Sequence, residues 1–135
     1  MKRSSQTQLI AILLLAACGQ TNMAYDKACS KPPPGFRTER DGRGHLRPYL
    51  SIEISDQGWL TWAGTPISDN QLGSLVREAG QLNPQPLLVL EVGPSTPCDR
   101  VDVVRKIVAS APICREDHRC SEGRNPENWR EVGGP

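Results

Sequence analysis

Cys18 has the surroundings of a cysteine that is modified with lipid. Lys2 and Arg3 make the start of the chain positive, residues 9–15 are apolar, and two alanines precede Cys18. This order is typical of a bacterial lipoprotein signal, and the apolar stretch is far shorter than the roughly 20 residues of a transmembrane helix. We therefore expect residues 1–17 to be a signal peptide and Cys18 to be the acylated N-terminus.

The alternative is an ordinary secretory signal that happens to precede a cysteine. If Cys18 is acylated, its chains anchor the protein firmly, because each buried methylene contributes about 0.8 kcal/mol. Gly19 follows the cysteine, and it is not the aspartate that retains lipoproteins in the inner membrane of some bacteria. We therefore expect the outer membrane, on its periplasmic face, as the location.

Four further cysteines, Cys29, Cys98, Cys114 and Cys120, follow Cys18. An even number in an oxidising compartment predicts two disulfides. Because the predicted last strand runs parallel to its neighbour, its far end brings Cys120 beside Cys98, so we predict a Cys98–Cys120 pair and, by elimination, a Cys29–Cys114 pair. If residues 114–120 form a loop instead, the expected pairs are Cys114 with Cys120 and Cys29 with Cys98.

His118 lies between Cys114 and Cys120, so two thiolates and an imidazole could bind zinc. This set lacks a second Cys-x-x-Cys pair, and an oxidising compartment favours disulfides over thiolates. We expect no metal and no cofactor. A small hydrolase or metal-binding protein that uses this segment remains the alternative function.

Enzyme motifs are not evident elsewhere in the sequence. It contains no Gly-x-Ser-x-Gly, no phosphate-binding glycine loop and no His-Glu-x-x-His. Ser68 and Ser95 occupy expected cap or loop positions. Asp99 and Asp102 are three residues apart, but acidic residues are common in the first turn of a helix because of the helix dipole. We expect a protein that is not an enzyme.

The elements that position these residues follow from hydrophobic periodicity. Leu50, Ile52 and Ile54 alternate with polar residues, and an aromatic run at 59–62 follows a turn at 55–58, so a β-hairpin is predicted.

Trp59 and Trp62 are three apart in the second predicted strand and should face opposite sides. One should pack against the helices. The other should be exposed as a contact residue, unless the chain ends cover it.

Two helices and further strands are predicted after the hairpin. A capping box of Ser68 and Gln71 starts a helix over 69–82, and the apolar run 87–92 fits a central strand. The buried face of the first helix is predicted from apolar residues at helical spacing: Leu72, Leu75, Val76, Ala79 and Leu82. Thr96 and Pro97 are the expected cap and first residue of a second helix, which Pro112 ends, and 113–118 is a short final strand. The predicted fold is α+β, with two helices on one face of a small sheet made of the hairpin and one or two further strands.

The domain boundaries follow from composition. Residues 18–47 are rich in Pro, Gly and charge and are predicted to be a flexible tether, 48–120 the folded domain, and 121–135 a tail that Trp129 anchors. Removal of residues 1–17, which carry two positive charges and no negative one, changes the formal net charge from +1 to −1. A chain near neutrality argues against nucleic acid as a partner.

This order of elements resembles the periplasmic domain of ExbD/TolR-type biopolymer transport proteins over about 50–114. The stretches that carry the resemblance are Leu50-Ser-Ile-Glu-Ile54, Gly58-Trp-Leu-Thr-Trp62, Gly64-Thr-Pro-Ile67, Asn83-Pro84 before Leu88-Val-Leu90, and Pro97 leading into Val101 to Val104. The resemblance implies an envelope interaction module that contacts peptidoglycan, another envelope protein or a second copy of itself.

Two departures limit what the resemblance implies. The family has an N-terminal transmembrane helix with a proton-handling aspartate, which the lipid on Cys18 would replace here. Family members also tend to have an aspartate after the buried strand, where this chain has Gly93. We therefore expect no proton-channel role. A structural lipoprotein that links the outer membrane to peptidoglycan is the third reading.

Overall fold

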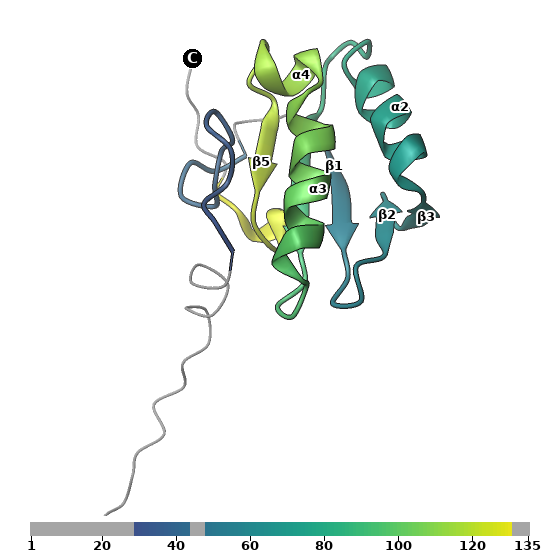
Figure 1. The fold of residues 1–135 in the computed structure, drawn as a ribbon. Coiled ribbons are helices and arrows are strands. Elements are labelled where there is room, and N and C mark those ends of the chain that lie inside the picture. The colour runs from purple at the N-terminus through teal and green to yellow at the C-terminus, as the bar shows by residue number, and fades with distance from the viewer. Residues whose placement is uncertain (1–28, 44–47, 131–135) are drawn as a thin grey trace, which may run out of the picture.

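A five-stranded mixed sheet with helices on one face forms the α+β fold of the computed structural model, which describes residues 29–43 and 48–130 (Figure 1). The strand order is β3-β2-β1-β4-β5; β2 is antiparallel to β1 and β3, and β4 is parallel to β1 and β5. The predicted fold class is thereby confirmed.

The elements are β1 (Tyr49–Ile54), β2 (Leu60–Trp62), β3 (Thr65–Ile67), α2 (Asp69–Ala79), β4 (Leu87–Val92), α3 (Cys98–Ala109), α4 (Pro112–Arg115), β5 (Cys120–Glu122) and the 3-10 helix η1 (Pro126–Asn128). None of the helices in this described part is long and apolar enough to span a bilayer.

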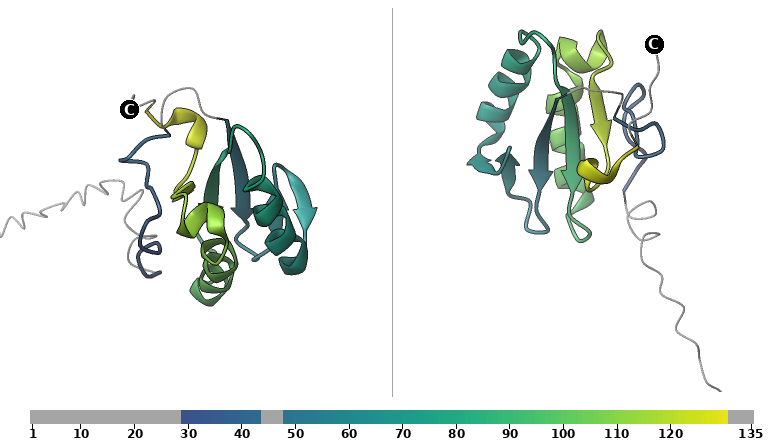
Figure 2. Two further views of the ribbon diagram at one scale, coloured as in Figure 1. Left: turned by 90° about the horizontal axis from the view of Figure 1, so that it is seen from above. Right: turned by 180° about the vertical axis from the view of Figure 1, so that it is seen from behind.

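Alternation along the strands sends one set of side chains to the helices and the other to the opposite face. Ile52 and Ile54 of β1 are buried in the main core, which also holds Leu88 and Leu90 of β4. The buried side chains of α2 and α3 belong to the same core, because both helices lie on this face of the sheet (Figures 1 and 2). The period-two pattern therefore correctly predicted which face of β1 is buried.

The face of the sheet away from the helices, here called the open face, is only partly covered. Leu87 and Val89 of β4 form a small second core there with the buried ring of Trp129, and Tyr49 packs against it. Seen from behind, the described C-terminal segment lies on the β4–β5 side of the sheet, and no other described helix or strand crosses β1 or β2 on this face (Figure 2). The half of the open face nearest the carboxyl ends of β1 and β4 is therefore accessible.

Helix α2 begins as predicted and ends three residues earlier than predicted. The Ser68 hydroxyl accepts from the backbone N–H of Gln71, whose side chain accepts from the backbone N–H of Ser68. Gly80, a poor helix former, caps the last turn. The next residues form tighter turn hydrogen bonds, with the Leu82 N–H donating to Ala79, so Leu82 is 53% exposed instead of joining the core.

The expected cap of α3 is wrong by one residue. Pro97 is the N-cap, and no side chain caps this helix. Thr96 is buried, and its hydroxyl donates instead to the carbonyl oxygens of Ile54 and Ser55. Thr96 therefore joins the β4–α3 turn to the end of β1.

The predicted final strand at 113–118 is also wrong. Pro112 takes the first position of the short helix α4, a place that suits proline because it has no N–H to leave unpaired. Ile113 and Cys114 are buried from this helical turn, and the last strand is β5, from Cys120 to Glu122.

The predicted domain limits of 48 and 120 were too narrow on both sides. Residues 29–43, assigned above to the tether, lie against the domain: Arg37 pairs with the outer edge of β5 through hydrogen bonds with Cys120 and Glu122. Ser121 and Trp129, assigned to the tail, are buried. Backbone pairing supplies the order that the polar composition of these segments did not predict.

Candidate functional site

A groove of about 440 Å³ lies on the accessible half of the open face. Alternation places Glu53 of β1, Thr61 of β2 and Glu91 of β4 side by side across neighbouring strands, since Glu53 pairs with both others in the sheet register. The rim comes from loops after β1 and β4 and from the segment after β5. The lining residues are Glu53, Ile54, Ser55, Asp56, Gln57, Trp59, Thr61, Glu91, Val92, Gly93, Pro94, Arg124 and Asn125.

The two tryptophans of the hairpin lie as their spacing predicted. Trp62 packs against the main core on the helix face. Trp59 is 75% exposed at the rim of the groove. Its backbone is held by Ser55, whose hydroxyl accepts from the Trp59 N–H and whose N–H donates to the Trp59 carbonyl. Trp59 is therefore an exposed aromatic side chain on a fixed turn.

The groove is richer in hydrogen-bond acceptors than in donors. It contains three carboxylates, of Glu53, Asp56 and Glu91, and one guanidinium, of Arg124. Ser51 donates its hydroxyl to Glu91 at 2.6 Å, which orients that carboxylate. The hydroxyl oxygen of Thr61, also in the lining, is buried and has no hydrogen-bond partner. This set suits a partner that brings positive charge or N–H donors.

Asp56 occupies the space that any side chain at position 93 would need. A Cβ added to Gly93 would meet the Asp56 carboxylate and would lie 2.9 Å from the Thr96 hydroxyl oxygen. Asp56 also accepts from the Ser95 N–H at 2.8 Å. The end of β4 therefore does have a carboxylate beside it, but Asp56 of the β1–β2 turn supplies it. The absence of an aspartate at position 93 gave no sign of this substitute.

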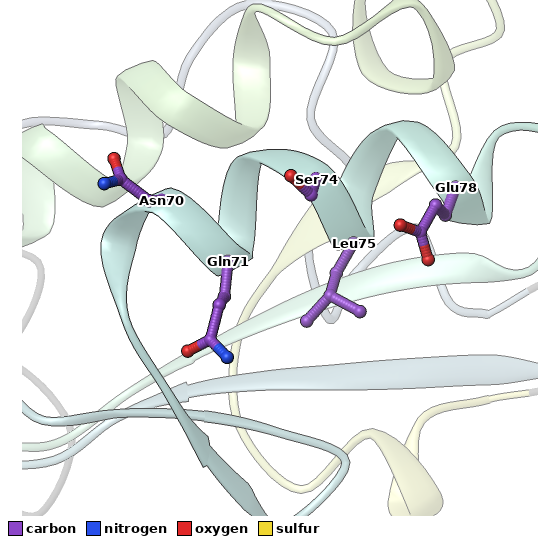
Figure 3. Close-up of a pocket in the computed structure, with 5 residues that line it drawn as sticks. All are labelled: Asn70, Gln71, Ser74, Leu75 and Glu78. Atoms are coloured by element: carbon purple, nitrogen blue, oxygen red, sulfur yellow. The ribbon is translucent and has the colours of Figure 1, made fainter.

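A second hollow, of about 360 Å³, lies along the outer side of α2 (Figure 3). Its five lining residues all come from this one helix, and Leu75 is its apolar member. Leu75 is half-buried, whereas the sequence pattern placed it in the core with Leu72. Because no second element closes this hollow, it lacks the converging groups of a binding site.

The disulfide pairing expected from a final strand, Cys98 with Cys120 and Cys29 with Cys114, is wrong. The structure joins Cys29 to Cys98 and Cys114 to Cys120, with Cα separations of 5.2 and 5.0 Å. This is the pairing expected if 114–120 is not a strand, and the reason is that α4 and a turn bring Cys114 back to the start of β5. Cys18 lies outside the described residues.

The alternative metal site loses its sulfur ligands in this pairing. Cys114 and Cys120 are bonded to each other, so neither sulfur is a thiolate. His118 is exposed, and its ring lies near Gly35 of the N-terminal segment. Within the described residues no group of three or more His, Cys, Asp or Glu is arranged to hold a metal ion.

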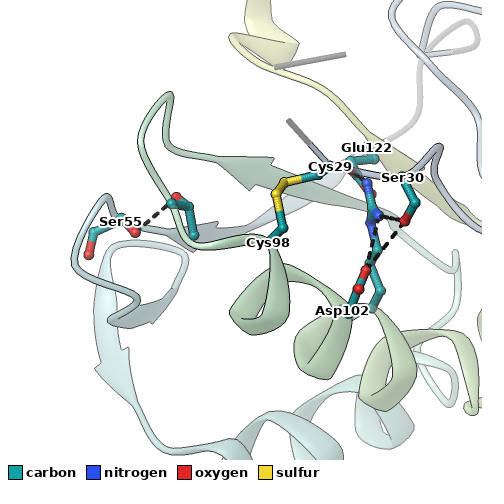
Figure 4. Close-up of a disulfide and its surroundings, with 8 residues drawn as sticks. Cys29, Ser30, Ser55, Cys98, Asp102 and Glu122 are labelled. Carbon is teal, nitrogen blue, oxygen red and sulfur yellow. Dashed lines mark hydrogen bonds and ion pairs between the residues drawn. A yellow bond between two sulfur atoms is a disulfide. The ribbon is translucent and has the colours of Figure 1, made fainter. Parts of the chain in front are cut away.

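The Cys29–Cys98 disulfide lies beside a buried ion pair (Figure 4). Arg105 of α3 donates two hydrogen bonds to the Glu122 carboxylate of β5, at 2.7 and 2.9 Å, and both residues are buried. Arg105 also donates to the Ser30 hydroxyl, next to the disulfide, and to Asp102. The disulfide and this ion pair together hold the N-terminal segment against α3 and β5.

A second ion pair fixes the two long helices relative to each other. Arg100 of α3 donates two hydrogen bonds to Asp69, the first residue of α2, and a third to the Gly58 carbonyl. Hydrogen bonding with Arg100 lowers the pKa of Asp69 below its ordinary value and raises that of Arg100. Neither ion pair leaves a local sequence signal, because the partners are 31 and 17 residues apart in the chain.

Neither a protein-family model nor a curated protein sequence matches this chain.

Proposed function

We propose that this chain is a lipid-anchored, non-enzymatic interaction module of the bacterial envelope, similar in role to the periplasmic domain of ExbD/TolR-type proteins. It acts by binding a protein partner and does not itself conduct protons. The lipoprotein signal at Cys18 supports the anchor and an outer-membrane location facing the periplasm. The groove beside Trp59 is the observation that carries the contact role.

The groove favours a positively charged segment of another protein. Its three carboxylates outnumber its one guanidinium, so a segment that carries lysine or arginine complements its charge. Exposed aromatic residues next to a concave polar surface are frequent hot spots of protein interfaces. Peptidoglycan contact, which would make the chain a structural link to the outer membrane, is the competing outcome.

Self-association by pairing of sheet edges is disfavoured. The edge of β5 is covered by Arg37. The other edge of the sheet is β3. A two-residue turn at Ala63 and Gly64 joins it to β2, so the backbone groups of Thr65 bond to Trp62. The backbone of the next residue, Pro66, therefore faces away from β2, toward the open edge. Proline has no N–H to donate, so this edge resists addition of another strand. A homodimer would therefore have to use a face of the domain.

Photo-crosslinking in cells tests the contact role. A photoreactive residue in place of Glu53, exposed within the groove, should give a protein adduct, whereas the same residue in place of Lys106, exposed on α3, should not. Equal adducts at both positions, or none at Glu53, would contradict the proposal.

A pull-down on purified sacculi tests whether the chain binds peptidoglycan instead of a protein partner. Binding to sacculi that Trp59→Ala abolishes would favour the peptidoglycan link. Wild-type protein that stays in the supernatant would favour a protein partner.

A further inference from the structure

The Cys29–Cys98 disulfide attaches the N-terminal chain to one particular end of the sheet. Cys98 is the first residue of α3, which follows the carboxyl end of β4. Cys29 therefore lies near the turns at 55–59 and 93–97, which follow β1 and β4; Figure 4 shows Ser55 and Cys98 on this side of the molecule. We call these two turns the carboxyl-end surface.

The length of chain before Cys29 is short compared with the domain. Cys18 and Cys29 are separated by eleven Cα steps in the sequence, which reach at most about 40 Å when fully extended. A domain of about 100 residues has a radius of gyration of about 13 Å, so its far side lies roughly 30 Å from Cys29. Presenting that far side, at 80–86 and 116–118, to the membrane would use about three-quarters of this maximum reach.

The chemistry of the carboxyl-end surface suits a zwitterionic lipid headgroup layer. Trp59 is 75% exposed there, and tryptophan is enriched where membrane meets water because its ring is apolar and its N–H is polar. Asp56 is the one charged residue in the two turns, and its carboxylate already accepts the Ser95 N–H. The remaining residues of the two turns are neutral: Ser55, Gln57, Gly58, Gly93, Pro94, Ser95, Thr96 and Pro97.

We propose that the carboxyl-end surface rests on the phospholipid headgroups of the membrane that holds the lipid on Cys18, with Trp59 as its main contact. The inference rests on the proposed lipid anchor. Since Trp59 is also at the rim of the groove, the groove opens close to the bilayer. Its protein partner then presents a positively charged segment at the surface of the same membrane.

Paramagnetic relaxation enhancement of backbone amides tests this orientation. The described elements of the fold run from Tyr49 to Asn128, so a protein that begins at Cys18 contains all of them. With the other four cysteines paired, the Cys18 thiol can be coupled to a maleimide phospholipid in zwitterionic nanodiscs that carry gadolinium headgroups. The amides of 55–59 and 93–97 should then be enhanced several-fold more than those of 80–86 and 116–118.

Matched variants distinguish contact of the carboxyl-end surface with the headgroups from mere nearness caused by the short chain to the lipid. Trp59→Ala should reduce the enhancement at both turns, whereas Val103→Ala, which truncates an apolar side chain that is 45% exposed on α3, should not. The double variant Cys29→Ser, Cys98→Ser removes the disulfide and so lengthens the chain between the lipid and the domain. It should reduce the difference in enhancement between the two ends of the domain. Equal enhancement at both ends, or no effect of Trp59→Ala, would overturn the proposal. Because the lipid is coupled chemically, this result does not depend on acylation in cells, which is tested separately.

Discussion

At the scale of single residues, the buried pair of Arg105 and Glu122 is an interaction that is costly to break. Both side chains are nearly inaccessible, and Glu122→Gln would leave the Arg105 charge without its full counter-charge. Breaking one partner of a buried pair costs about 3–5 kcal/mol, so urea denaturation should show a loss of that order. Asp102→Asn, at the exposed partner of Arg105, is the control and should cost less than about 1 kcal/mol. Similar losses in both variants would contradict the assigned geometry.

The Asp69–Arg100 ion pair makes stability depend on pH. Hydrogen bonding with Arg100 lowers the folded-state pKa of Asp69, so its contribution is present above the unfolded pKa, near 3.8, and is lost as pH falls through the folded value. The Asp69 side chain is 43% exposed, and solvent screening limits the contribution to about 1 kcal/mol or less. Denaturation between neutral and acidic pH should therefore show a smaller loss of stability for Asp69→Asn than for wild type. Identical profiles would refute the assignment.

At the scale of elements, α2 offers a comparison between a core and a surface position on one helix. Leu72 is fully buried, whereas Leu75 is half-buried beside the hollow of Figure 3. Leu72→Ala should cost about 2–5 kcal/mol and Leu75→Ala clearly less. Ser68→Ala should cost about 1 kcal/mol through loss of the capping box. Melts in which Leu75→Ala is the most damaging change would mean that the helix is rotated from its assigned face.

The turn after β4 has no room for a side chain at position 93. Gly93→Ala would force the new methyl group against Asp56 and Thr96. Overpacking of this kind costs about 1–3 kcal/mol. Gly64→Ala is a useful comparison, because no atom lies within 4 Å of a Cβ there and only the positive φ of 82° opposes the change. Truncating the obstructing side chain by Asp56→Ala should partly rescue Gly93→Ala, and a calorimetric melt without rescue would contradict the packing described.

Elements with strong local signals were predictable from the sequence, and those that depend on distant contacts were not. The alternation at Ile52 and Ile54 and the capping box at Ser68 gave β1 and the start of α2 correctly. The strand predicted at 113–118 failed because proline can start a helix as well as end one, and the disulfide error followed from it. The groove was only partly foreseeable: Trp59 was singled out, but Glu53 and Glu91 meet only through strand pairing.

At the scale of the whole molecule, both ends of the described chain complete the domain. Backbone hydrogen bonds join Arg37 to β5 and Arg43 to Arg130, and the Cys29–Cys98 disulfide closes the arrangement. Residues 29–43 of the predicted tether therefore belong to the folded domain. Peptide mapping of the non-reduced protein should recover Cys29 linked to Cys98 and Cys114 linked to Cys120. A Cys98–Cys120 peptide would contradict this closure.

At the same scale, the proposed anchoring depends on the lipid at Cys18, and membrane fractionation of cells that express wild-type and Cys18→Ser protein tests it most directly. The wild-type chain should sediment with the membranes as a processed form. Cys18→Ser should either appear in the soluble fraction or accumulate as an unprocessed precursor, because the acceptor thiol is gone. Normal processing and normal sedimentation of Cys18→Ser would contradict the anchored module proposed here.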